Sequence, residues 1–69
     1  MTDKNGLHIT ARDRLLIAWQ RSTELVRDYQ AYKAETAENE QVSEKFGKYA
    51  HDEAIHAAEL LDMLHEYDR

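Results

Sequence analysis

Apolar residues recur at helical spacing along most of the chain, but their stripe changes face near residue 37. The first stripe contains Leu15, Ala18, Leu25, Tyr29 and Tyr32, and the second contains Val42, Phe46, Tyr49, Leu60, Met63, Leu64 and Tyr67. At about 100° per residue, the second stripe is about 140° out of phase with the first. In one straight helix, the apolar residues of the two halves would therefore lie on different faces. A chain reversal near residues 37–40 removes this conflict.

The composition favours helix throughout, because the 69 residues include no proline and only two glycines. Thr10 and Asp13 have the spacing of a capping box, and Asn39 is a suitable N-cap for a second helix. We therefore predict an all-α chain: a flexible N-terminal tail over residues 1–9 and a helical hairpin over 10–69, with helices over about 10–37 and 40–68. One long coiled-coil helix is the alternative, since no glycine or proline marks the turn.

A two-helix hairpin cannot enclose a core, because one flank of each apolar stripe stays in water. Chains this short usually need disulfides, a metal or a partner, and the absence of cysteine excludes the first. We expect the antiparallel hairpin to dimerise, or to assemble further, into a ferritin-like four-helix bundle. The alternative is a marginally folded monomer.

Several functional classes are disfavoured by charge and hydropathy. The formal net charge of −5 argues against nucleic acid as a partner. The longest apolar run, Leu15 to Trp19, is too short to span a membrane, and the N-terminal residues lack the apolar segment of a secretory signal. The absence of cysteine fits a reducing compartment, so we expect a cytoplasmic protein.

Glu53 and His56 interrupt the second apolar stripe at positions where apolar residues would be expected. Burying a lone carboxylate is costly, so Glu53 needs a partner. Carboxylate oxygen and imidazole nitrogen together suit iron, manganese or zinc, and the spacing of three residues points both side chains to one side of the helix. The sequence thus predicts a metal site at Glu53 and His56. A Glu–His hydrogen bond, or an ion pair with arginine from a neighbouring helix, is the structural alternative.

Two segments resemble the rubrerythrin-like and encapsulated-ferritin-like hairpins of the ferritin-like superfamily: "VRDYQAYKAETAENE" and "ENEQVSEKFGKYAHDEAIHAAELLDMLHEY". The resemblance covers about residues 15–67. It implies a dimer with iron at the subunit interface, a di-iron centre or a single divalent metal, and possible oxidation of ferrous iron. Glu53 and His56 would then be ligands, with Tyr29 or Tyr32 near the metal.

The first helix departs from the pattern of that family. Its ligand glutamate would fall seven residues before a tyrosine, which in this chain gives Ser22 or Leu25. The nearest carboxylate, Glu24, points about 140° away from the first stripe. A dimer would then offer two glutamates and two histidines. Whether the chain is an enzyme stays open, and a metal-free ferritin-like structural or protein-interaction module is the competing hypothesis.

Overall fold

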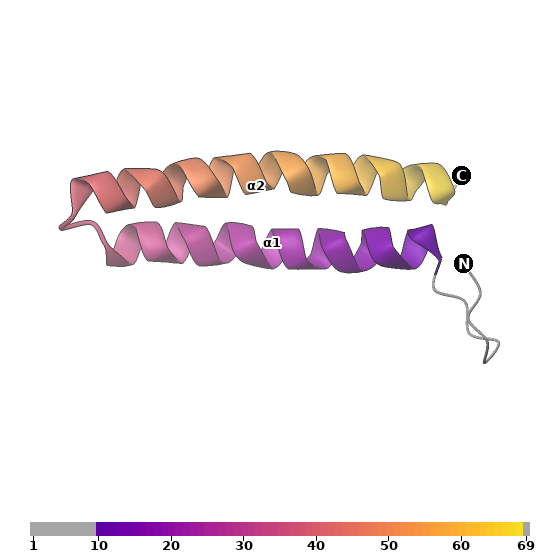
Figure 1. The fold of residues 1–69 in the computed structure, drawn as a ribbon, viewed down its shortest axis with the longest axis horizontal. Coiled ribbons are helices and arrows are strands. Elements are labelled where there is room, and N and C mark those ends of the chain that lie inside the picture. The colour runs from indigo at the N-terminus through magenta and orange to yellow at the C-terminus, as the bar shows by residue number, and fades with distance from the viewer. Residues whose placement is uncertain (1–9, 69) are drawn as a thin grey trace.

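The computed structural model describes residues 10–68, which form two α-helices: α1 (Ala11–Glu35) and α2 (Glu40–Tyr67). Figure 1 shows them side by side and antiparallel, joined by the turn at residues 36–39. The predicted all-helical hairpin is confirmed, and the alternative of one long helix is wrong. The predicted flexible tail, residues 1–9, lies outside the described residues. Neither described helix is long and apolar enough to cross a membrane.

The capping box predicted at the start of α1 is confirmed. The Oγ1 atom of Thr10 accepts a hydrogen bond of 3.1 Å from the backbone N–H of Asp13. The Asp13 carboxylate accepts one of 3.3 Å from the backbone N–H of Thr10. These two bonds satisfy backbone donors that the first helical turn leaves without partners, which is why α1 begins here.

The turn is held by polar side chains at the ends of both helices. Asn39 is the N-cap of α2, as predicted, and its Oδ1 atom accepts a hydrogen bond of 3.2 Å from the backbone N–H of Val42. Its own backbone N–H donates to the carbonyl of Thr36 at 2.9 Å. Thr36 and Asn39 have φ of −110° and −111°. These values are open to any L-residue, so neither end of the turn requires glycine.

Small side chains line the contact between the helices. The buried residues of α2 recur every seventh position, and they are Ser43, Ala50, Ala57 and Leu64. Ser22 is the buried residue of α1. Small residues at a seven-residue repeat let two helices approach closely along one line. Leu64 belongs both to this line and to the predicted apolar stripe of α2, but most other members of that stripe lie about 60° to 100° to one side of the line.

The larger apolar side chains therefore gather on one face of the hairpin instead of between the helices. The exposed members include Leu25, Tyr32, Val42, Tyr49, Met63 and Tyr67, which are 38% to 56% exposed. Ring contacts join Tyr32 of α1 to Phe46 of α2, with centroids 5.3 Å apart, and an apolar groove joins Ala18 to Met63 and Tyr67. We call this surface the open apolar face. It also carries Glu53 and His56.

Candidate functional site

Glu53 lies midway along α2 and is held by one group from each helix. The hydroxyl of Ser22 on α1 donates a hydrogen bond of 2.7 Å to its Oε2 atom. The Nδ1 atom of His56, one turn further along α2, lies 3.4 Å from its Oε1 atom. The Glu53 side chain is 19% exposed, so most of its surface is out of water. Both carboxylate oxygens thus have a polar neighbour within the same chain.

Ser22 is placed opposite Glu53 by the helical repeat of α1. It lies seven residues before Tyr29, on the side of α1 that faces α2, and it is 7% exposed. No described side chain has a buried nitrogen or oxygen without a hydrogen-bond partner. The burial of Glu53 is therefore compensated inside the hairpin by a neutral donor, which a buried carboxylate needs.

His56 has a different environment from Glu53. Its side chain is 61% exposed, on the open apolar face. The distance of 3.4 Å to Glu53 is long for a hydrogen bond but within the range of an ion pair when the ring is protonated. The imidazole therefore lies beside the carboxylate and remains accessible from outside the hairpin.

The ligands of a single chain do not complete a metal site. Within residues 10–68, no group of three or more histidine, cysteine, aspartate or glutamate side chains could hold a metal ion. The structure does bring Glu53 and His56 together, as the sequence predicted, but their role as ligands stays a prediction. A metal would fit here only if a second chain supplied further ligands.

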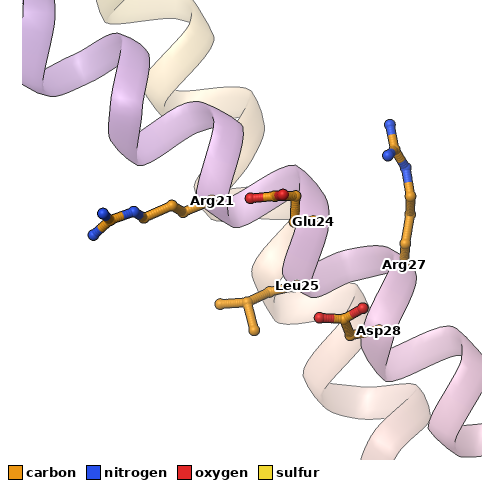
Figure 2. A pocket seen from close by; sticks show the side chains of 5 residues that line it. All are labelled: Arg21, Glu24, Leu25, Arg27 and Asp28. Carbon is orange, nitrogen blue, oxygen red and sulfur yellow. The ribbon is translucent and has the colours of Figure 1, made fainter.

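The carboxylates of the middle of α1 do not reach Glu53. Glu24 and Asp28 line a shallow hollow on the surface of α1 together with Arg21, Leu25 and Arg27. In Figure 2, both carboxylates extend to the same side as Arg21 and Leu25, while Arg27 extends away from them. Glu24 is therefore no substitute for the carboxylate that the resemblance places on the first helix.

Sequence reasoning identified the position of Ser22 but missed its role. The sequence pattern marks this position only as one that lacks a carboxylate ligand, whereas in the structure Ser22 is the hydrogen-bond donor to Glu53. A signal was available: Ser22 interrupts the first apolar stripe as Glu53 interrupts the second. Two polar residues at core positions of paired helices commonly satisfy each other.

The two tyrosines expected near the metal belong to an aromatic cluster closer to the turn. Tyr29 contacts Tyr32, Phe46 and Tyr49, with ring centroids 5.8 to 6.5 Å apart. Such spacings and tilts are typical of aromatic packing. The cluster thus packs the half of the open apolar face that lies between the Ser22–Glu53 contact and the turn.

Fold and site together define an all-helical hairpin with a polar cluster of Ser22, Glu53 and His56 on one side. Comparisons of the chain with models of known families, with curated proteins and with solved structures found no match.

Proposed function

We propose that this chain is a ferritin-like hairpin that binds a divalent metal, iron by resemblance, between two copies. Glu53 and His56 of each copy are the ligands. The observation that carries the proposal is their adjacency on the open apolar face, with Nδ1 of His56 3.4 Å from Oε1 of Glu53. An apolar face that becomes covered on association excludes water around such a pair and strengthens its hold on a cation.

The need for two copies follows from the number of ligands. One chain offers one carboxylate and one imidazole, whereas protein sites for iron, manganese or zinc use three or more protein ligands. Two copies supply two of each. A single divalent ion suits this set better than a di-iron centre, because Ser22 stands where a further carboxylate would be needed. The absence of cysteine favours a cytoplasmic setting.

Metal content per chain tests the proposal directly. The wild-type protein, purified from cultures supplemented with iron, manganese or zinc, should carry about one ion per two chains. The double variant Glu53→Ala/His56→Ala should carry almost none. The matched control Glu59→Ala/His65→Ala removes the same side-chain types from exposed positions of α2 and should keep the metal. Equal and negligible metal in all three proteins would overturn the proposal.

A metal-free interaction module is the second candidate, and one observation favours it. The hydrogen bond from Ser22 to Glu53 satisfies the half-buried carboxylate without any cation. Under this alternative, the hairpin assembles equally well in the presence of a chelator, and Glu53→Ala/His56→Ala does not weaken assembly. Sedimentation of both proteins with and without chelator separates the two candidates, because a bridging metal stabilises the assembly only when it is present.

A further inference from the structure

Four charged residues form a row along α1 beside the open apolar face. They follow each other every seventh position in the order Arg14, Arg21, Asp28 and Glu35, and all four are exposed. Around the helix axis, the row is rotated by about 100° from the line of Ser22 and Tyr29, which faces α2. It therefore forms a continuous charged edge along the length of α1. Within residues 10–68, none of the four forms an ion pair.

The order of signs makes this row complementary to itself. Both positive charges lie in the first half of α1 and both negative charges in the second half. A second copy of α1, placed antiparallel, brings Arg14 opposite Glu35 of the partner subunit and Arg21 opposite Asp28 of the partner subunit. The symmetry then repeats both pairs. A parallel arrangement in register would place like charges together, which is unfavourable.

The apolar row next to these charges has the same symmetry. Ala18, Leu25 and Tyr32 also recur every seventh position, with Leu25 in the middle. The antiparallel register that pairs the charges sets Leu25 near Leu25 of the partner subunit and Tyr32 near Ala18 of the partner subunit. Ala18 lines an apolar groove with Leu15, Met63 and Tyr67. The small residue thus leaves space where the 42% exposed ring of Tyr32 would arrive.

The size of the face suits a stable dimer. α1 has 25 residues, so the hairpin is about 38 Å long and, with its helices about 10 Å apart, about 20 Å wide. Each copy can therefore offer about 750 Å², close to the 800 Å² per partner of standard interfaces. Most of the face is apolar, charged residues follow its α1 edge, and the Glu53–His56 pair is the polar group near its middle.

We propose that two copies pack their open apolar faces together about a two-fold axis beside Leu25, with α1 antiparallel to α1 of the partner subunit. The row of Arg14, Arg21, Asp28 and Glu35 sets the register. Figure 2 shows its central members, Arg21 and Asp28, extending to the same side of α1 as Leu25. This inference rests on the association step of the proposed function but not on the metal.

The same register determines where the two candidate metal-binding pairs meet. The hydrogen bond between Ser22 and Glu53 sets Glu53 at the level of Ser22, about three residues or 4 Å along α1 from the two-fold axis. The Glu53–His56 pairs of both copies therefore lie close to the axis, within the covered face. The geometry of the dimer and the sharing of a metal are then separate properties with separate tests.

Charge reversal tests the register in buffer that contains a chelator. In the proposed dimer, residue 21 of each copy faces residue 28 of the other copy. Arg21→Asp therefore places two carboxylates together at both of these contacts, and Asp28→Arg places two guanidinium groups together at both. Each variant should weaken the homodimer about tenfold at low salt, with a smaller effect at high salt. Mixing the two variants restores opposite charges at both contacts, so heterodimers should exceed the half expected from random pairing.

Two controls separate this effect from damage to the hairpin. Arg27→Asp makes the same charge change on the side of α1 that points away from the row, and it should leave dimerisation unchanged. The double variant Arg21→Asp/Asp28→Arg restores complementarity and should dimerise like the wild type. Random pairing in the mixture, or equal weakening by Arg27→Asp, would overturn the proposed register.

A cysteine at the axis supplies an independent measurement. The described residues contain no cysteine, and neither does the rest of the sequence, so Leu25→Cys introduces a single thiol. Two such thiols near the axis should form a disulfide-linked dimer rapidly on mild oxidation. Ala31→Cys, on the outward side of α1, should not. No faster cross-linking at position 25 than at 31 would contradict the proposed register. Loss of metal binding in the metal-content measurement, with cross-linking at position 25 retained, would contradict only the proposed function.

Discussion

The Ser22 hydroxyl donates a 2.7 Å hydrogen bond to Glu53, and this bond joins the two helices across their line of contact. Both residues stand at positions where an apolar residue would continue the stripe of their helix. A carboxylate in this position would be costly without a donor. The bond can form only when the two helices pair in this register. It therefore favours this register over arrangements in which one helix is shifted along the other.

Ser22→Ala should lower the free energy of unfolding by about 1–2 kcal/mol, because it leaves a mostly covered carboxylate without its hydrogen-bond donor. Urea unfolding followed by circular dichroism measures the change. Thr23→Ala is the control: the Thr23 hydroxyl donates only to the carbonyl of Gln20 in its own helix, so its removal should cost less than about 0.5 kcal/mol.

A double-mutant cycle of Ser22→Ala and Glu53→Ala isolates the contact itself. The two changes should couple by about 1 kcal/mol, since the double variant lacks both the donor and the group that needs it. Additive effects of the two substitutions would show that the pair does not interact in solution.

Asn39→Ala should destabilise the hairpin by about 1 kcal/mol, because Oδ1 of Asn39 accepts the Val42 backbone N–H at the start of α2. Asn39→Asp keeps an acceptor at the same place and should stay within about 0.5 kcal/mol of the wild type. The comparison is made by thermal and urea unfolding at one protein concentration. An aspartate variant as unstable as the alanine variant would contradict the capping role.

Gly47→Ala tests how closely the helices approach near the turn. A Cβ atom at this position would lie 3.2 Å from Cδ of Lys33 on α1. The Lys33 side chain is exposed and can move by a few tenths of an ångström, so the gain in helix propensity should dominate. We expect stabilisation of somewhat less than about 1 kcal/mol. A loss of stability that Lys33→Ala relieves would show instead that the contact is rigid.

The ion pair between Arg12 and Asp68 should contribute stability that depends on pH. Hydrogen bonding from the Arg12 guanidinium, at 2.8 Å, lowers the pKa of Asp68 from its usual value of 3.8. Because the native pKa lies below the unfolded one, the stabilisation is fully present above the unfolded pKa and is lost as the pH falls through the native value.

A cycle of Arg12→Gln and Asp68→Asn, measured by unfolding across the acid range, isolates this pair from the effects of each charge on its own helix end. The coupling should be favourable at neutral pH, weaken with added salt and vanish in strong acid. A coupling that does not change with pH would contradict an ionic origin.

Much of the hairpin could be predicted from local sequence. The capping pairs at Thr10 and Asn39 act within one helical turn, so their geometry follows from spacing alone. Because the two apolar stripes differ in phase, the chain is expected to reverse its direction between them, and the structure contains this reversal. The adjacency of Glu53 and His56 likewise follows from the helical repeat.

Tertiary structure decided which residues meet across the helices. Ser22 and Glu53 lie 31 positions apart, and their contact depends on the register of one helix against the other. The buried apolar residues at the helix contact are Ala50, Ala57 and Leu64, whereas most of the large apolar side chains that dominate the sequence pattern lie beside this contact. A hairpin of two helices can bury only one narrow line of side chains. The wider apolar stripe therefore remains on the surface, beside Glu53, whose hydrogen-bond donor on α1 is supplied only by the pairing of the helices.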